Sequence, residues 1–409
     1  MYICRNFKSL RIKSYNDPIY GFISIPFPFL STLIQEPVFQ RLRRIQQMGL
    51  SHYVFSGATH HRFAHALGAM HLMHKSLDVL TNKGISISNA EKEAAMIAIL
   101  LHDIGHGPFS HALEGVLIKD ISHESLSLSL MTSLNQKHNG KLSLAIEMFT
   151  NEYKRPFFHQ LVSSQLDMDR LDYLKRDSFY SGVTEGNINT DRIITMLMVH
   201  NDQLVVEDKG IYSVEKFLLA RRLMYWAVYL HKTSFAAEEV LKRIILRAKE
   251  LVADGQTIEA SADLFYIIKA SHKTIDQIDM DHYTAIDDVD VLSMIKAGVK
   301  HNDSVFSALC HMILSRQLPK INVSNESFST RFLKAKKESA IKALNLFPEN
   351  IPYFVFDGEM KNMAYNLKQS PIRLIDKNGN IKELLAGSDQ SNLNILTKAV
   401  TKYYCCFPK

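Results

Sequence analysis

Apolar residues recur at helical spacing over most of this chain. In 38–48 an apolar residue falls at every third position, which predicts a helix with a single apolar stripe. Residues 94–101 are apolar on every side, as is typical of a helix in the centre of a bundle. Ser88 and Glu91 have the spacing of a capping box and predict where that helix begins. Before this helical part, 19–25 follows a turn signal and is a candidate strand.

Two further long helices are predicted at 165–180 and 214–248. Between them, 204–212 alternates apolar and polar residues and contains the sequence Asp208-Lys209-Gly210, which is typical of a turn. This pattern predicts a β-hairpin between the two helices.

The pattern changes near residue 351. Segments 353–356 and 371–375 are predicted strands, a tight-turn sequence follows the second at 377–380, and 391–404 is a predicted last helix. We therefore expect a mainly α protein, with a helical core and helical extension over 1–350 and a small α+β C-terminal region over 351–409.

Composition places the chain among soluble globular proteins. It has 409 residues, of which 46% are hydrophobic, and a net charge of +6. No apolar run is long enough to cross a membrane, the first ten residues lack a signal-peptide core, and the four cysteines lack metal-finger spacing. We expect a cytoplasmic protein without a membrane partner. The mild positive charge suits polyanionic small molecules and also permits weak binding of single-stranded nucleic acid.

Three separated segments carry side chains that bind divalent metals: His65, the adjacent pair His102 and Asp103, and Asp169. The pair directly follows the apolar helix 94–101, where a buried charge must be paired or bound to metal. If the segments converge, they form the site of a metal-dependent phosphohydrolase. Two histidines and two carboxylates suit Mn, Fe, Zn or Ni, and suit Mg less well.

Side chains suited to phosphate and sugar recur at helical spacing beside these ligands. Arg62 and His65 share a helix face, and a guanidinium offers a planar fork to phosphate oxygens. Asp169, Tyr173 and Asp177 line another face, where they could hold metal, sugar and hydroxyl in succession.

Two neighbouring patterns have a structural explanation as well. Asp172 and Arg176 have the spacing of an ordinary helical salt bridge. Arg221, Tyr225 and Tyr229 also recur every four residues, and for Tyr225 aromatic packing in a core explains the position at least as well as a binding role.

Histidines are unusually dense after the metal-binding pair. His106, His111 and His123 follow it, with Glu124 next to the last. A neutral imidazole acts as general acid or base near neutral pH, so a leaving group here could be protonated. The three histidines could also recruit a second metal ion, and each taken singly is compatible with a structural role.

Together these motifs resemble the HD superfamily of phosphohydrolases. The similarity is to the branch of the SAM-and-HD-domain deoxynucleoside triphosphate triphosphohydrolases, in the bacterial form without a SAM domain. It runs from about Tyr15 to about Leu246 and is carried by eight ordered segments: 16–21, 39–49, 53–60, 62–65, 102–111, 123–124, 167–177 and 229–232. The resemblance implies an HD-domain helical bundle.

The resemblance implies that His65, His102, Asp103 and Asp169 hold one divalent transition metal, with Mg²⁺ able to accompany the substrate phosphates. It also implies a catalytic group of side chains. His111 and His123 match the catalytic histidines of the family, with His106 in the same pocket, and Glu114 and Glu124 would orient them. Glu114 stands where the family usually has an aspartate.

Further residues match positions that contact the substrate. For the phosphates they are Arg62, Arg170 and Arg221, and for the deoxyribose they are Gln47, Tyr173 and Asp177. Tyr229 matches a tyrosine that packs against the 2′ carbon of the sugar and disfavours ribonucleotides.

The resemblance also implies nucleotide regulation and assembly. Gln40 and Arg43 match base-contacting positions of a regulatory site, although Gln35 replaces the acidic residue found there in the family. Similar proteins form homodimers or homotetramers, and a nucleotide other than a guanine nucleotide, or none, could activate this one.

The expected reaction is hydrolysis of a dNTP at its α-phosphorus to give a deoxynucleoside and inorganic triphosphate. Two alternatives remain open. One is an HD phosphohydrolase acting on another nucleotide phosphoester. The other is a nucleotide sensor or single-stranded nucleic-acid binder without catalysis.

Overall fold

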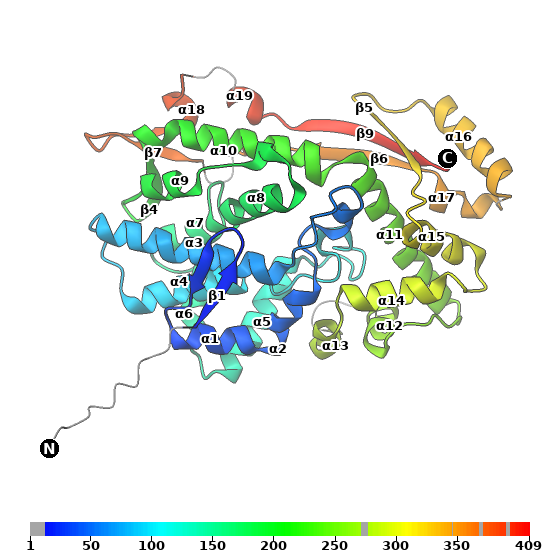
Figure 1. The fold of residues 1–409 in the computed structure, drawn as a ribbon, viewed down its shortest axis with the longest axis horizontal. Helices are drawn as coiled ribbons and strands as arrows, with labels where there is room; N and C mark the ends of the chain where they lie inside the picture. The colour runs from blue at the N-terminus through cyan, green and yellow to red at the C-terminus, as the bar shows by residue number, and fades with distance from the viewer. Residues whose placement is uncertain (1–12, 271–276, 346, 368–370, 390–392) are drawn as a thin grey trace.

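Helices make up most of the molecule, as the sequence predicts (Figure 1). The computed structural model describes residues 13–270, 277–345, 347–367, 371–389 and 393–409. The chain opens with a hairpin, β1 (Ser14–Asp17) and β2 (Gly21–Ser24), followed by α1 (Pro28–Gln35) and α2 (Pro37–Gln40). The predicted strand 19–25 is therefore confirmed. The predicted helix 38–48 is wrong after Gln40, because the chain tightens into a 3₁₀ turn at Arg41–Arg44 and then extends.

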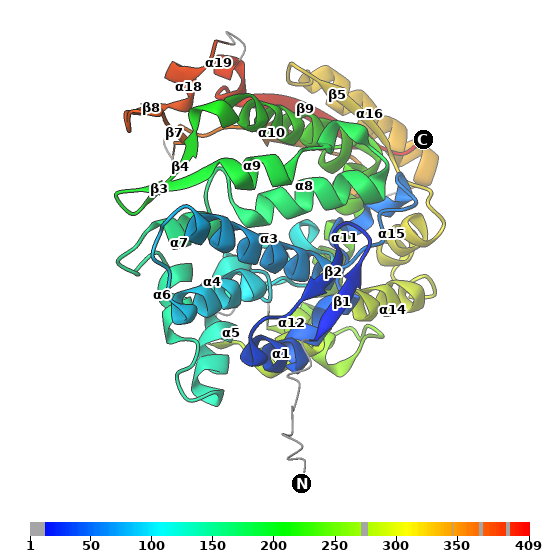
Figure 2. The ribbon, with the colours of Figure 1, turned by 60° about the vertical axis from the view of Figure 1, so that its left-hand side comes forward.

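The helical core is a bundle in which α8 packs on α3 and α3 packs on α4. Its helices are α3 (Arg62–Asn82), α4 (Asn89–Leu101), α5 (His123–Lys137), α6 (Ser143–Phe149), α7 (Phe157–Val162) and α8 (Met168–Ser181). The capping box of Ser88 and Glu91 begins α4, as predicted, and every residue of 94–101 is buried. Figure 2 shows α8 lying between α3 and α10.

The segment after α8 returns across the bundle. It comprises α9 (Thr190–Met196), β3 (Leu197–His200), β4 (Gln203–Glu207), α10 (Ile211–Met224), a π-helical turn (Tyr225–Tyr229) and α11 (Lys232–Ala253). The predicted hairpin at 204–212 is wrong. The turn lies at Asn201 and Asp202, both with positive φ, while 208–210 forms a 3₁₀ turn leading into α10. The predicted helix 214–248 is interrupted after Tyr229.

A second hydrophobic core surrounds α11, whereas Leu374, Leu384, Leu393 and Leu396 pack into the first core. Both cores thus include helices and strands that follow α11. The helices are α12 (Ala262–Lys269), α13 (Met280–Ala285), α14 (Asp288–Gly298), α15 (Ser304–Leu314), α16 (Thr330–Leu344), α17 (Ile351–Phe354), α18 (Leu384–Gly387) and α19 (Leu393–Leu396). The strands are β5 (Lys320–Ser324), β6 (Phe356–Asn362), β7 (Arg373–Ile375), β8 (Ile381–Glu383) and β9 (Val400–Phe407).

The C-terminal strands join two different sheets. β9 lies between β5 and β6, and β7 pairs in parallel with β4 and antiparallel with β8. The predicted last helix 391–404 is wrong where it is described, because only 393–396 is helical and 400–407 is a strand. Strand 353–356 is likewise replaced by α17, with β6 beginning at Phe356, whereas strand 371–375 is confirmed at 373–375. Within the described ranges, no helix is long and apolar enough to cross a membrane.

Candidate active site

The four predicted metal ligands converge, although they come from three helices. His65 lies in the first turn of α3, His102 caps the end of α4, and Asp169 lies in the first turn of α8. Nε2 of His65 is 3.1 Å from Oδ1 of Asp169 and 3.6 Å from Oδ2 of Asp103. Nε2 of His102 is 3.3 Å from Oδ1 of Asp103 and 3.5 Å from Oδ1 of Asp169.

Each histidine is held through its other nitrogen. Nδ1 of His65 lies 2.7 Å from Oδ2 of Asp172, and Nδ1 of His102 lies 2.6 Å from the carbonyl oxygen of Ile99. Such contacts fix the tautomer and turn Nε2 toward the ligand cluster. Asp172 is in turn held by Arg176, whose Nε donates to it over 2.9 Å.

The cluster has the properties of a divalent-cation site. Nε2 of His65 and of His102 are buried and make no hydrogen bond of good geometry to any described residue, although such buried groups are almost always satisfied. Burial lowers the pKa of His65, but the carboxylates of Asp169 and Asp172 outweigh it and raise the pKa to about 10. A position where carboxylates stabilise positive charge so strongly suits a metal ion, and the donor set suits a transition metal.

Arg62 lies beside this cluster and is almost fully buried. Its Nη1 donates to Oδ2 of Asp103, and its Nε donates to Oγ of Ser110 over 2.6 Å. Burial raises the pKa of Asp103, but His102 and Arg62 outweigh it and hold the pKa well below its usual range. The guanidinium is thus fixed at the metal-ligand cluster, where it can meet a phosphate.

Three histidines form the next part of the site. Glu114 joins two of them, with Oε2 3.0 Å from Nδ1 of His111 and Oε1 2.7 Å from Nδ1 of His123. His106 stacks on His123 with ring centroids 3.9 Å apart, and its Nε2 is 3.4 Å from Oδ1 of Asp103. Burial and the neighbouring Arg62 keep the pKa of His106 well below its usual value, so this imidazole is neutral.

Tyrosines and a buried carboxylate form the opposite wall. Oη of Tyr229 donates to Oδ2 of Asp177 over 2.7 Å, and Nε2 of His60 is 2.8 Å from Oδ1 of the same carboxylate. Burial, and then the charge of Asp177, raise the pKa of Tyr229 well above its usual value, so its hydroxyl stays protonated. Tyr173 and Tyr225 pack edge-to-face against Tyr229.

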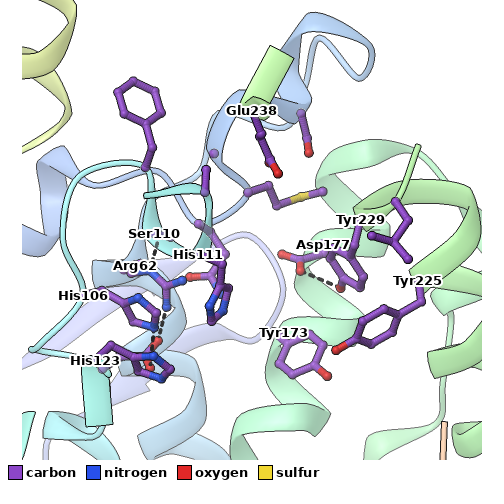
Figure 3. Close-up of a pocket in the computed structure, with 18 of the residues that line it drawn as sticks. Arg62, His106, Ser110, His111, His123, Tyr173, Asp177, Tyr225, Tyr229 and Glu238 are labelled. Atoms are coloured by element: carbon purple, nitrogen blue, oxygen red, sulfur yellow. Dashed lines mark hydrogen bonds and ion pairs between the residues drawn. The ribbon is translucent and has the colours of Figure 1, made fainter. Parts of the chain in front are cut away.

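One cavity of about 450 Å³ joins these groups (Figure 3). Its lining includes Arg62 and the three histidines on one side and Tyr173, Asp177, Tyr225 and Tyr229 on the other. The volume lies within the range of small-molecule sites. The cavity lies where the two hydrophobic cores meet, because α3 and α8 belong to the first core and α11 to the second.

Comparisons with known proteins agree with this geometry. A family model for the HD domain matches residues 62–177, and a model for the HD associated region matches residues 188–266. The protein YwfO of Bacillus subtilis is 32% identical over 416 residues, which cover 97% of this chain and 92% of YwfO. The chain belongs to the HD superfamily of phosphohydrolases.

A solved phosphohydrolase structure from Bacteroides thetaiotaomicron resembles this HD phosphohydrolase over 97% of the chain and 100% of its own length, with 45% identity and a TM-score of 0.93. The human deoxynucleoside triphosphate triphosphohydrolase SAMHD1 is 28% identical over 285 residues, 59% of this chain and 45% of the human protein. Its Dictyostelium discoideum homologue is 29% identical over 266 residues, 60% of this chain and 51% of that protein.

Not every predicted site residue of this HD phosphohydrolase reaches the cavity. Gln47 and Arg170 line it. Glu124 is exposed and its carboxylate makes no hydrogen bond within the described residues, so Glu114 is the carboxylate that orients His111 and His123. Arg221 lies outside the lining, and its Nη1 donates to the carbonyl oxygen of Ala364 over 3.0 Å.

The two residues predicted for regulation also lie outside this cavity. Nε of Arg43 donates to Oε1 of Gln40 over 2.9 Å, and Nε2 of Gln40 donates to the carbonyl oxygen of Ile34. The guanidinium of Arg43 also covers the ring of Phe63, 3.5 Å from its centroid. The pair is therefore ordered by its own contacts.

Sequence reasoning missed several residues of the site. Asp172 was assigned only to a salt bridge with Arg176, which the structure confirms, but it also orients His65. His60 and Ser110 hold Asp177 and Arg62, and Glu238 lines the cavity from α11. The one-turn spacing of Asp169 and Asp172 was a usable signal for Asp172, whereas nothing in the local pattern marks Glu238.

Proposed function

We propose that this HD phosphohydrolase is a metal-dependent dNTP triphosphohydrolase that releases a deoxynucleoside and inorganic triphosphate. The observation that carries the proposal is the single cavity lined by Asp169, Arg62 and the Tyr229–Asp177 pair. A metal-ligand cluster and an arginine suit phosphates, while a tyrosine–carboxylate pair suits a sugar. The names of the human and Dictyostelium relatives support the same reaction.

In the proposed complex the triphosphate lies at the metal-ligand end of the cavity. Arg62 and Arg170 balance its charge there, and both line the cavity. Nε of Arg170 donates to the Ser164 carbonyl oxygen over 2.7 Å, which fixes the guanidinium. When bound, the divalent ion would polarise a phosphoryl oxygen and lower the pKa of water.

The deoxyribose lies at the opposite wall. Asp177 accepts hydrogen bonds from Tyr229 and His60 and retains lone pairs for a sugar hydroxyl. Gln47 has a buried side-chain oxygen with no hydrogen-bond partner in the described part of the chain, which also suits a sugar hydroxyl. The ring of Tyr229 then occupies space beside the 2′ carbon and excludes a 2′-hydroxyl.

The histidines supply the proton transfers. The carboxylate of Glu114 contacts Nδ1 of both His111 and His123, so Nε2 of each ring is the nitrogen free to face the cavity. Burial raises the pKa of Glu114, but its bonds to His111 and His123 outweigh it and hold the pKa well below the usual range, so the carboxylate stays ionised. One imidazole would protonate the departing 5′ oxygen as water attacks the α-phosphorus.

The proposal extends to regulation and assembly. Gln40 and Arg43 would contact the base of an activating nucleotide, and the enzyme would work in the cytoplasm as a homodimer or homotetramer. The division into a core over 1–350 and a C-terminal region over 351–409 also remains a prediction. Pairing of β9 with β5 crosses that boundary, so the two parts would not unfold separately.

Product analysis tests the proposal. The protein is incubated with Mn²⁺ and each dNTP or NTP, singly and mixed, and triphosphate, pyrophosphate and phosphate are resolved. We expect triphosphate and deoxynucleoside from dNTPs only. Release of pyrophosphate or phosphate, or equal turnover of NTPs, would favour the alternative phosphoester reaction. Nucleotide or nucleic-acid binding without turnover would favour a sensor.

A further inference from the structure

The cavity contains a carboxyl group that the proposed reaction does not use. Glu238 lies on α11, one turn after Phe235, and both side chains line the cavity. Figure 3 shows its carboxyl pointing into the cavity from a wall apart from His106 and His123. No hydrogen bond or ion pair to Glu238 occurs among the described residues.

Glu239, the next residue on α11, differs from Glu238 in its contacts. Glu239 is fully engaged, since it lies 2.7 Å from Nζ of Lys242 and 2.8 Å from Nη1 of Arg243. Glu238 has the same two cations on its helix but bonds to neither. Burial raises the pKa of Glu238 to about 7, against the weaker opposing effect of Lys242. Glu238 is half-buried and has no partner among the described residues, so its carboxyl is free to bind a ligand in the cavity.

The surroundings of Glu238 suit a flat heterocycle. Met48, Leu230 and Phe235 line the cavity and offer apolar surfaces. Phe235 lies one turn before Glu238, and Met48 precedes Gly49, whose Cβ position would lie 3.2 Å from Oε1 of Glu238. A nucleobase can pack on the apolar side chains with its faces and bind the carboxyl group with the hydrogen-bonding groups of its edge. A carboxylate would repel the triphosphate, which Arg62 and Arg170 attract at the other end. The charges therefore orient the nucleotide with its base toward Glu238.

We propose that Glu238 reads the edge of the substrate base and makes the enzyme prefer guanine. A carboxylate only accepts hydrogen bonds, and it can accept two side by side. Guanine presents two adjacent donors, N1–H and the 2-amino group. Adenine and cytosine present one amino group beside a ring acceptor, and thymine presents one N–H between two carbonyl oxygens. This inference rests on the proposed function, since it takes a deoxynucleotide as the ligand.

The test compares dGTP with dITP, which lacks only the 2-amino group. Both are mixed in one reaction with Mn²⁺ at pH 8, so any activating nucleotide acts equally on both, and the ratio of their kcat/KM values is measured. We expect the wild type to prefer dGTP by about tenfold, and Glu238→Ala to bring the ratio close to one. Glu250→Gln, an exposed acid on the same helix, should keep the wild-type ratio.

The outcomes separate this inference from the proposed function. Triphosphate release with the same dGTP:dITP ratio in wild type and Glu238→Ala overturns the role of Glu238 and leaves the reaction standing. If no triphosphate is released, the reaction fails, and calorimetric binding of dGTP and dITP to the same variants decides the inference alone. A guanine preference that depends on Glu238 supports it, and equal or absent binding overturns it. Loss of this half-buried acid should not impair folding, because no partner among the described residues would be left unpaired.

Discussion

At the scale of single residues, the two carboxylates of the metal-ligand cluster differ in their other contacts. Asp103 is buried and also binds Arg62, whereas the side chain of Asp169 is 29% exposed and makes no salt bridge to an arginine or lysine among the described residues. Removing Asp103 would leave a buried guanidinium unpaired, which costs about 3–5 kcal/mol. Asp169 is therefore the cleaner position at which to separate metal binding from folding.

We predict that Asp169→Asn loses bound metal and at least 100-fold in activity while its melting temperature stays close to that of the wild type. The amide keeps the shape of the side chain but removes the negative charge that a dication requires. Metal content by mass spectrometry and melting by circular dichroism measure the two effects. Asp191→Asn, an exposed acid on α9, should change neither. Wild-type metal content in Asp169→Asn would contradict the ligand assignment.

His102→Ala combined with Asp103→Ala should also lose metal and activity.

Tyr229 allows a second prediction at this scale. Tyr229→Ala opens space beside the 2′ carbon, so the kcat/KM for NTPs relative to dNTPs should rise at least tenfold. Tyr229→Phe removes the hydrogen bond to Asp177 but keeps the ring, and should preserve the discrimination. Competition between dATP and ATP in one reaction measures the ratio. An unchanged ratio in Tyr229→Ala would show that the ring does not exclude the 2′-hydroxyl.

The convergence of the proposed metal ligands could be predicted from the sequence because each sits in a recognisable local context. His102 and Asp103 end an apolar helix, and Asp169 begins a charged one. Glu238 could not be predicted in this way, since its importance depends on the absence of partners. Only the structure shows that Lys242 and Arg243 both pair with Glu239 and leave Glu238 without an ion pair to either.

At the scale of elements, α3 and α8 approach closely where Gly68 lies. A Cβ at Gly68 would lie 2.0 Å from Oδ1 of Asp172 and 2.3 Å from Nη2 of Arg176. The buried ion pair that holds His65 therefore occupies the space that any larger residue would need. This contact links helix packing directly to the orientation of a metal ligand.

We expect Gly68→Ala to destabilise the protein by about 3 kcal/mol or more, because overpacking and a displaced buried ion pair act together. Metal affinity should fall as well, since Asp172 no longer fixes His65. Urea denaturation and metal titration measure the two effects. Ala69→Gly, at the next position of α3, costs about 1 kcal/mol of helix propensity together with one buried methyl group, but leaves the ion pair in place and should keep metal affinity. Unchanged metal affinity in Gly68→Ala would separate Asp172 from the metal site.

The N-terminus of α14 holds the active-site loop from a distance in sequence. Oδ1 and Oδ2 of Asp288 accept the backbone N–H groups of Phe109 and Gln46, over 2.7 and 2.8 Å. Burial raises the pKa of Asp288 to about 7, although these two bonds oppose the shift. The carboxyl therefore connects the second core to the loop that carries His106 and His111.

This raised pKa predicts a pH dependence of stability. Between pH 4 and 7 the folded state holds the proton of Asp288 while the unfolded state releases it, so its contribution to the free energy of unfolding falls as pH rises, by on the order of 4 kcal/mol. The advantage of the wild type over Asp288→Asn should shrink over that range and level off above pH 7. Urea denaturation of both proteins from pH 4 to 8 measures it. A difference in the free energy of unfolding between the two proteins that stays constant over this pH range would contradict the raised pKa of Asp288.

Elements with local determinants were predicted well, and those fixed by distant contacts were not. The capping box that begins α4 is local, and that helix begins where predicted. Residues 400–404 have helical spacing but form β9, because β5 and β6 provide strand edges on both sides. The π-helical turn between α10 and α11 begins at Tyr225 and ends at Tyr229, and both side chains line the cavity.

At the scale of the whole molecule, two hydrophobic cores meet at the cavity and each supplies part of its wall. The first core carries the proposed metal ligands, Arg62 and the side chains of α8 that we propose face the sugar. The second packs against the loop after α4 and contributes α11. A nucleotide in the cavity would therefore contact both cores, which explains why neither half of the sequence contains the whole site.

The most direct test of the central claim is the position of cleavage, followed in H₂¹⁸O with a dNTP and Mn²⁺. Attack on the α-phosphorus with departure of the 5′ oxygen places one ¹⁸O atom in inorganic triphosphate and none in the deoxynucleoside, and mass spectrometry of both products should show this. Label in pyrophosphate, monophosphate or the deoxynucleoside would mean that a different bond is broken, and would contradict the proposed reaction.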